Sequence, residues 1–271
     1  MRRAATIAAA ILGLVGPVLV DGPVSLEAQR GGAPQPRAPR AAAPIDLTGY
    51  WVSIVTQDWR WRMVTPRKGD YQGIQITPEA AKVAAAWDPA QDEAAGLQCK
   101  SYGAPALMSV PGRIHITWQD DTTLKVDTDA GTQTRLLRFG DAKMPTDGPR
   151  SWQGVSQAQW LTPRPNVPLQ LRPADRTADA PDARPTGGSL RVVTRNLRAG
   201  YLRKNGVPYS ENATITEYFH RLPPHPNGDE WLHVVTIVED PQYLNNRFIV
   251  SSHFKKVPDG SGWDPTPCAE S

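Results

Sequence analysis

Residues 200–241 carry the clearest pattern of apolar and polar positions in the chain, with two alternating runs separated by a break. The first run extends from Asn212 to His220 and the second from Trp231 to Asp240, and both are rich in Thr, Ile, Val, Tyr and Phe. A segment of Pro, Asn and Gly lies between them. Alternation with a period of two, bounded by turn formers, is typical of strands, so a β-hairpin is predicted.

Three ionisable residues of this hairpin share a phase with apolar neighbours. Glu217 lies two residues from Ile215 and from Phe219, and His233 and Glu239 stand in the same relation to apolar residues of the second run. An ionisable group on an apolar face needs a partner, a ligand or a cavity. Two carboxylates in one environment would have pKa values moved upward and apart, which suits acid–base catalysis. The alternative is a structural ion pair. The expected basic partners of Glu217 are Arg195, Arg203 and Lys255.

Shorter periodic runs along the rest of the chain predict further strands and little helix. One helix is expected from Thr77, a suitable N-cap before Pro78, to Trp87, and a weaker helical stretch follows at 92–95. The count is nine to eleven strands. The predicted strands outside the hairpin are 45–56, 58–65, 71–76, a four-stranded meander over 106–139, 151–161, 189–197 and 247–256.

In the run 58–65, Trp59, Trp61 and Met63 alternate with Arg60, Arg62 and Val64. A strand there would place Trp59, Trp61 and Met63 on one face. Such a row forms either part of the core or the wall of a cavity that binds an aromatic ligand.

Sequential strands with short turns predict an all-β fold, a closed or nearly closed antiparallel β-barrel, lipocalin-like in architecture, with one short helix. A β-sandwich is the alternative. The expected boundaries are a signal peptide at 1–28, a flexible Pro/Ala-rich tail at 29–44, and a single barrel domain at 45–271. Within the domain, 162–188 is a proline-rich loop that is expected to be disordered or to act as a lid.

The N-terminus has the layout of a secretory signal. Arg2 and Arg3 precede an apolar run from Ala4 to Val20, and small residues near Ala28 offer a cleavage site. The mature chain is therefore expected in the periplasm or outside the cell, with no membrane span after removal of the signal. Cys99 and Cys268 have no metal-ligand spacing, so a disulfide is the expected state.

Charge argues against a nucleic acid as partner. The chain holds 30 basic and 27 acidic residues, and residues 1–40 contain five of the basic and two of the acidic ones, which leaves 25 of each from Ala41 onward. A neutral body implies no basic face. A small-molecule ligand or substrate is the expected partner.

Motifs of hydrolases, zincins and nucleotide binders are absent from the sequence, so neither a cofactor nor a metal is expected. The five histidines are scattered, and satisfaction by a backbone carbonyl or water is favoured over a three-histidine metal site. The candidate catalytic residues are Glu217, His233 and Glu239. The candidate ligand-binding residues are Trp59, Trp61, His115, Arg203, Tyr209, Tyr218 and His253.

Four short segments resemble a broad group of secreted, β-rich bacterial proteins without an assigned activity. They read SWQGVSQAQW at 151–160, NGVPYS at 205–210, EYF at 217–219 and VEDPQY at 238–243. The chain departs from that pattern by the proline-rich loop after Trp160. The resemblance implies export and a β-rich body, and it brings no reaction with it.

Three functions remain as hypotheses. The first is an exported barrel that binds a small aromatic or apolar molecule in its interior. The second is a cofactor-independent isomerase, hydratase or lyase that uses carboxylate or histidine acid–base chemistry. The third is a structural envelope protein, which would contain no cavity.

Overall fold

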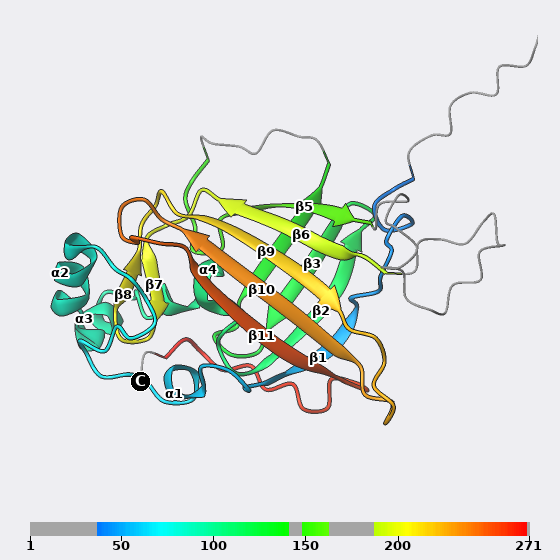
Figure 1. Cartoon of the computed structure of the whole chain (residues 1–271), viewed down its shortest axis with the longest axis horizontal. Coiled ribbons are helices and arrows are strands. Elements are labelled where there is room, and N and C mark those ends of the chain that lie inside the picture. The colour runs from blue at the N-terminus through cyan, green and yellow to red at the C-terminus, as the bar shows by residue number, and fades with distance from the viewer. Residues whose placement is uncertain (1–36, 141–147, 163–186, 270–271) are drawn as a thin grey trace, which may run out of the picture. The chain divides into compact units, whose positions relative to one another are not determined.

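The computed structural model describes residues 37–140, 148–162 and 187–269, and the expected signal peptide at 1–28 lies outside them (Figure 1). Nine strands close into a barrel in the order β1-β11-β10-β9-β6-β5-β4-β3-β2. These strands are β1 (Gly49–Ile54), β2 (Arg113–Asp120), β3 (Thr123–Thr128), β4 (Thr134–Phe139), β5 (Val155–Leu161), β6 (Ser189–Arg195), β9 (Thr214–Arg221), β10 (Trp231–Glu239) and β11 (Phe248–Val257). The prediction of a closed all-β barrel is confirmed.

The barrel is antiparallel at every junction but one. β4 and β5 run parallel, and their register contains three residue pairs, Leu137 with Ser156, Arg138 with Gln157 and Phe139 with Ala158. The expectation that all neighbouring strands are antiparallel is therefore wrong at this junction.

The predicted hairpin forms the wall from β9 to β10. Its register pairs Glu217 with Thr236 and His220 with His233. Along both strands buried residues alternate with partly exposed ones, so Ile215, Glu217 and Phe219 face the interior. The side chains that the strands send inward form a core with Trp51 and Phe254 among its largest members.

Short helices and a second, two-stranded sheet gather at one end of the barrel (Figure 1). The sheet pairs β7 (Gly200–Arg203) with β8 (Val207–Tyr209), and α2 packs on β8 while α4 and η1 pack on β7. The described residues contain four α-helices and one 3-10 helix, where the sequence predicted one short helix. They are α1 (Trp59–Arg62), α2 (Pro78–Ala86), α3 (Pro89–Ala94), η1 (Lys100–Tyr102) and α4 (Ala104–Leu107).

The predicted helix at Thr77 is confirmed, because Thr77 Oγ1 accepts from the Ala80 amide and Pro78 takes the first helical position. Three predicted strands are wrong. The run 58–65 contains α1, 71–76 contributes one isolated bridge from Ile76 to Leu244, and the first strand of the meander is α4.

Cys99 and Cys268 form a disulfide, with an S–S distance of 2.00 Å and 5.1 Å between the Cα atoms. The bond ties the C-terminal segment to the start of η1. Tyr102 Oη adds a hydrogen bond to the Ala269 carbonyl 3.0 Å away. The predicted disulfide is therefore present, and it lies beside the barrel end that carries the helices.

The last residues of the expected N-terminal tail, 37–44, contact the barrel. Trp160 Nε1 donates to the Pro39 carbonyl at 2.9 Å, and the Arg40 amide donates to the Asp121 carbonyl at 3.1 Å. Most of the expected proline-rich loop, residues 163–186, lies outside the described residues.

Candidate functional site

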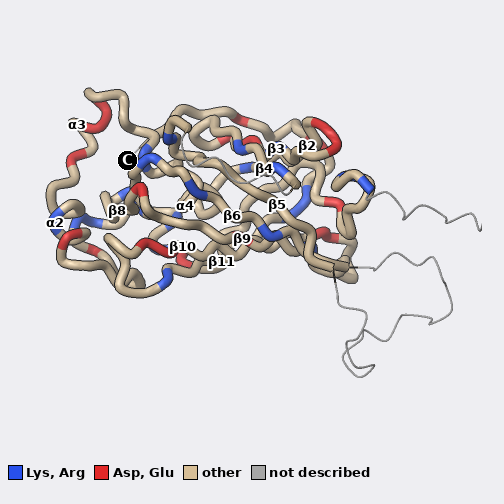
Figure 2. The backbone as a smooth tube through the Cα atoms, turned by 90° about the horizontal axis from the view of Figure 1, so that it is seen from above, with Lys and Arg blue, Asp and Glu red and all other residues tan. Residues whose placement is uncertain are grey.

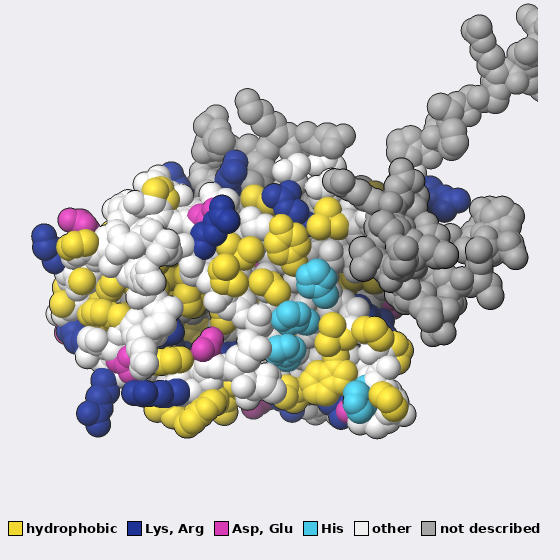
Figure 3. Space-filling view, in the orientation of Figure 1, with side chains coloured by type: hydrophobic (Ala, Val, Ile, Leu, Met, Phe, Trp, Pro, Cys, Tyr) yellow, Lys and Arg dark blue, Asp and Glu magenta, His cyan; other side chains and the backbone are white. Residues whose placement is uncertain are grey.

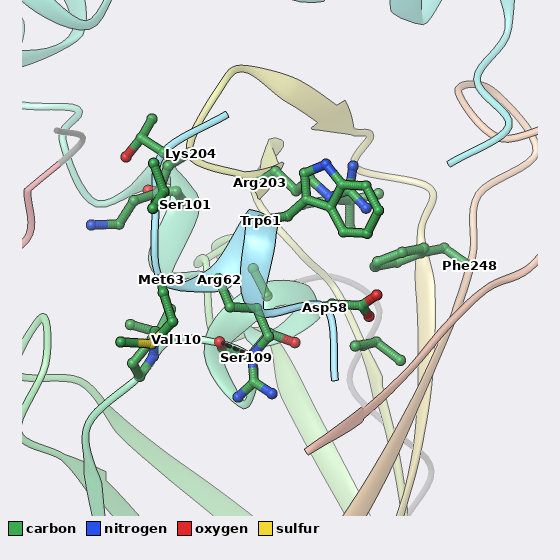
Figure 4. Close-up of a pocket in the computed structure, with 16 residues that line it drawn as sticks. Asp58, Trp61, Arg62, Met63, Ser101, Ser109, Val110, Arg203, Lys204 and Phe248 are labelled. Atoms are coloured by element: carbon green, nitrogen blue, oxygen red, sulfur yellow. Dashed lines mark hydrogen bonds between the residues drawn. The ribbon is translucent and has the colours of Figure 1, made fainter. Parts of the chain in front are cut away.

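A pocket of about 240 Å³ lies where the helices meet the barrel (Figure 4). Five parts of the chain line it: α1 with its flanks, η1, α4 with the turn that follows it, β7 with the next residue, and the start of β11. Its lining residues are Asp58, Trp61, Arg62, Met63, Val64, Thr65, Ser101, Ala106, Ser109, Val110, Pro111, Leu202, Arg203, Lys204, Phe248 and Val250.

The short helix α1 decides which of its side chains reach the pocket. The backbone amides of Trp61 and Arg62 donate to the Asp58 carbonyl, and that of Met63 donates to Trp59. In a helix, residues two apart point in nearly opposite directions, whereas in a strand they share a face. Trp61 therefore lines the pocket, while Trp59 points away from it and is 63% exposed. The predicted shared face of the two tryptophans is wrong for this reason.

Arg62 is fixed in the pocket wall by two hydrogen bonds. Its Nε donates to the Ser109 carbonyl at 2.7 Å, and its Nη2 donates to Ser53 Oγ at 3.4 Å. Burial lowers the pKa of Arg62, and the nearby charge of Asp58 opposes that change. The guanidinium is thus both held in position and partly removed from water.

Arg203 approaches the same pocket from β7. Its guanidinium lies over the Trp61 ring, 4.6 Å from the centroid, and its Nη1 donates to the Gln72 carbonyl at 2.7 Å. Burial also lowers the pKa of Arg203, against the charges of Asp58 and Asp70. The sequence named Trp61 and Arg203 as ligand-binding candidates, and the structure brings these two together.

Several polar atoms of the lining are buried without a hydrogen-bond partner among the described residues. They are Trp61 Nε1, Arg62 Nη1 and Ser101 Oγ. Two of the three groups are obligate donors, and the Ser101 hydroxyl can donate. Buried polar groups in proteins are nearly always satisfied, so three unpartnered groups around one pocket are exceptions that a bound molecule or water would remove.

Apolar side chains form another part of the lining. Ala106, Val110 and Leu202 contribute to the wall, and Phe248 lies across from Trp61 (Figure 4). Exposed apolar side chains continue from the lining to the surface, since Met63 is 59% and Val64 62% exposed. The pocket thus combines an apolar wall with a small set of cationic groups, as ligand sites commonly do.

Asp58 lies at the edge of the pocket in a strained conformation. Its φ of 53° is in the left-handed region, and its side chain does not cap α1. Non-glycine residues persist in this region where the surrounding structure holds them, often at functional sites.

Glu217 faces the interior, as its phase predicts, and is bound there by a cation. Arg135 Nη1 and Nη2 donate to its two carboxylate oxygens at 2.9 and 2.5 Å, and the side chains are 1% and 0% exposed. Arg135 Nη2 also donates to Thr194 Oγ1 at 3.3 Å. The expectation of an ion pair is confirmed, whereas its expected partners, Arg195, Arg203 and Lys255, are wrong.

The two other candidate catalytic residues lie on the outer wall of the barrel. Glu239 pairs with Arg247, with Oε1 2.6 Å from Nε, and its side chain is half exposed. His233 stands in register with His220 and His253, and the ring centroids are 6.2 and 4.6 Å apart. The structure therefore does not bring Glu217, His233 and Glu239 together.

Histidines and apolar side chains share one outer face of the barrel (Figure 3). Burial lowers the pKa of His220, His233 and His253, and the charge of neighbouring His233 lowers it further for the other two. The ring of Tyr218 stacks on His220 at 6.2 Å on this wall. His115 stacks on Tyr50 at 3.8 Å, and burial lowers its pKa as well.

Tyr209 belongs to the core instead of a loop. It is fully buried in β8 among Leu197, Leu202 and Ile215, and burial raises the pKa of its hydroxyl. The expectation that it hangs at a hairpin mouth is wrong, because Val207–Tyr209 continues as a strand.

The sequence named only Trp61 and Arg203 of this lining as site candidates, and the polar residues it missed include Asp58, Arg62 and Ser101. The strand predicted for 58–65 placed Arg62 on the face opposite Trp61, and only the recognition of a helical turn would have placed it correctly. Ser101 lies in a short 3-10 helix next to the disulfide. These residues are distant from one another in the sequence, so no local sequence pattern assigns them to one pocket.

The described residues contain no group of three or more His, Cys, Asp or Glu side chains arranged to hold a metal ion. In this part of the chain, no helix has both the length and the apolar character that membrane crossing requires.

Comparisons of the chain with protein families, with curated proteins and with solved structures found no match.

Proposed function

We propose that this protein binds a small molecule with an aromatic or apolar body in the pocket at the barrel end. The observation that carries the proposal is the lining itself, in which Trp61 and Phe248 face a space bordered by aliphatic side chains. Aromatic and apolar walls with few polar groups are the usual composition of ligand sites.

The pocket size limits the ligand. Its volume of about 240 Å³ lies below the roughly 300–1,000 Å³ of pockets that hold drug-sized molecules. A molecule with a single ring suits this space. The site lies beside the barrel end instead of in the barrel interior, where inward side chains form the core.

Binding agrees with the geometry better than proton transfer by the candidate acid–base residues. Glu217 is enclosed and paired with Arg135, and His233 and Glu239 face outward. None of the three lines the pocket. General acid–base catalysis needs the group within hydrogen-bond reach of the substrate.

Export is part of the proposal. The N-terminal layout suits a secretory signal, and the Cys99–Cys268 disulfide is a bond that forms and persists in oxidising compartments. Basic and acidic positions are interspersed over the described chain (Figure 2), which favours a small molecule over a nucleic acid as partner.

A pair of tryptophan variants tests the proposal. The wild type, Trp61→Ala and Trp59→Ala would be titrated with a panel of single-ring aromatic compounds, both neutral and charged, with binding followed by heteronuclear NMR. We expect shifts of pocket resonances in the wild type and in Trp59→Ala, and binding at least about tenfold weaker in Trp61→Ala, since an aromatic contact contributes on the order of 1 kcal/mol or more.

Trp59 is the matched control because it belongs to the same helical turn and points away from the pocket. The proposal fails if no compound of the panel perturbs the pocket. It fails equally if the two alanine variants lose binding to the same degree while both remain folded.

A further inference from the structure

We propose that the pocket recognises an organic anion, an aromatic carboxylate, whose charged group pairs with Arg203 in a lining that Arg62 and Lys204 also make cationic. The inference rests on the proposed function and deepens it, because it names the chemical class of the ligand.

The charges of the lining are unequal. Arg62, Arg203 and Lys204 contribute three cationic groups, and Asp58 is the one acidic residue of the lining. Lys204 Nζ lies over the Tyr102 ring, 5.2 Å from its centroid. No ion pair joins Arg62 or Arg203 to a carboxylate within the described ranges 37–140, 148–162 and 187–269, in contrast to exposed Arg60, which pairs with Asp70. The pocket therefore has an excess of positive charge.

Burial makes that excess of positive charge costly. A cation that is withdrawn from water without a counterion is destabilised, and this destabilisation lowers the pKa of both arginines. Asp58 compensates in part, since its charge acts on each of them. A bound anion would supply the remaining compensation.

Hydrogen-bond donors accompany the charge. Nε and Nη2 of Arg62 are engaged with Ser109 and Ser53, which leaves buried Nη1 without a partner in the described part of the chain. Ser101, which is 1% exposed, and the indole of Trp61 each contribute a further unpartnered polar atom. Donors held by the fold need little reorganisation when an oxyanion arrives.

Guanidinium groups suit a carboxylate in particular. Their planar set of N–H donors matches the two oxygens of a carboxylate, and such charge-assisted bonds are stronger than neutral ones. The ring of the ligand would then lie against the apolar wall formed by Ala106, Val110 and Phe248. A single-ring carboxylate satisfies both parts of the pocket within its volume.

The test uses matched probes on the full mature protein. Benzoate and benzamide have nearly the same shape and differ in charge, and their affinities would be measured by ligand titration in the wild type, Arg203→Gln and Arg60→Gln. We expect benzoate to bind at least about tenfold more tightly than benzamide to the wild type, by analogy with hydrogen bonds to charged groups. This preference should be lost in Arg203→Gln and retained in Arg60→Gln.

Added salt provides a second measurement that needs no variant. The affinity for benzoate should decrease between low and high ionic strength, whereas that for benzamide should not. If Arg62→Gln folds, its affinities for benzoate and benzamide would be measured as well. If it does not fold, the result for Arg203→Gln decides the test.

The outcomes separate the two proposals. Equal binding of benzoate and benzamide would overturn the anion inference and leave the proposed small-molecule site standing. A preference for benzoate that survives in Arg203→Gln would overturn the assignment of the arginine. Absence of binding by both probes, and by the wider aromatic panel, would remove the proposed function together with this inference.

Discussion

Single side chains in this barrel have roles that depend on which side of the wall they occupy. Arg135 and Glu217 form a fully enclosed pair on the inside, while His220, His233 and His253 form a row on the outside. The interior pair gives up hydration and gains two hydrogen bonds between the guanidinium and the carboxylate. In the outer row, histidines that can become protonated near neutral pH lie next to one another.

Breaking the interior pair should be much more costly than replacing it. Arg135→Met leaves the Glu217 carboxylate buried without its cation, and we expect a loss of about 3–5 kcal/mol in the free energy of unfolding. The double variant Arg135→Met/Glu217→Leu should recover most of this loss, since apolar residues of similar volume often substitute for a buried ion pair. Urea unfolding of the three proteins measures both effects. A double variant as unstable as the single one would contradict this account.

The outer histidines should make stability depend on pH. Burial lowers the folded-state pKa values of His220, His233 and His253 below the 6.5 of an unperturbed histidine, so the unfolded chain binds more protons as the pH falls. Their contribution is fully present above about pH 6.5 and is lost as the pH falls through the folded-state pKa values.

Thermal unfolding across that pH range tests the histidine row. Arg62 also lowers the pKa of His253, whereas Lys255, on the same strand face, is paired with Asp229. His233→Gln should flatten the pH dependence most, because His233 stands opposite both of the others. His225→Gln, in the exposed β9–β10 connection, should leave it unchanged.

Among the elements, the β7–β8 hairpin positions the pocket arginine. Its turn contains Asn205 and Gly206, and Gly206 has a φ of +81°. Asn205 Nδ2 donates to the carbonyls of Arg67 and Asp70, which connects the turn to the segment after α1. The turn therefore fixes Arg203 relative to Trp61.

Gly206→Ala should disturb this connection. A methyl group there would lie 2.3 Å from Trp87 Cβ, and the left-handed backbone adds strain. We expect a loss of about 2–5 kcal/mol, from roughly 1–2 for the backbone and 1–3 for the overlap. Gly228→Ala is the control, because Gly228 has a φ of +84° and open space around its Cα. Equal losses in the two variants, measured by urea unfolding, would exclude a packing role for Gly206.

Comparison of β9 and α1 shows which elements the sequence could predict. The hairpin was predictable because strand phase, turn residues and burial agree from Thr214 to Glu239. The run at Trp59–Arg62 alternates equally well, but a turn of four residues has no periodicity to distinguish it from a strand. Arg135 was missed as the partner of Glu217 because the pairing crosses two intervening strands, and no local pattern records such a distance.

At the scale of the whole molecule, the disulfide and the pocket share one end of the barrel. Cys99 precedes η1, whose Ser101 lines the pocket, and Cys268 follows a bridge from Thr266 to Ala130. The C-terminal segment is therefore covalently tied to the site, although its described residues, up to Ala269, contribute nothing to the lining.

The parallel junction between β4 and β5 follows from the strand number. In a closed barrel, every pair of neighbouring strands can be antiparallel only if the number of strands is even, and this barrel has nine. A ring with an odd number of strands must contain at least one pair of parallel neighbours. In this barrel that pair is β4 and β5, and their register contains fewer residue pairs than that of any other barrel junction. We expect the barrel to open first at this junction, because parallel pairing is slightly less stable per residue than antiparallel pairing.

The Arg135–Glu217 ion pair links strands on the two sides of the β4–β5 junction. Arg135 extends from β4 to Glu217 on β9, and β5 and β6 lie between these two strands. In Glu217→Gln, amide hydrogen exchange should therefore accelerate first in β4 and β5, whereas Gly206→Ala should accelerate it at the other sheet. Uniform acceleration of hydrogen exchange in both variants would show that the β4–β5 junction is no less stable than the rest of the barrel. The most deeply buried ion pair of the described residues thus connects strands across the one barrel junction where neighbouring strands do not alternate in direction.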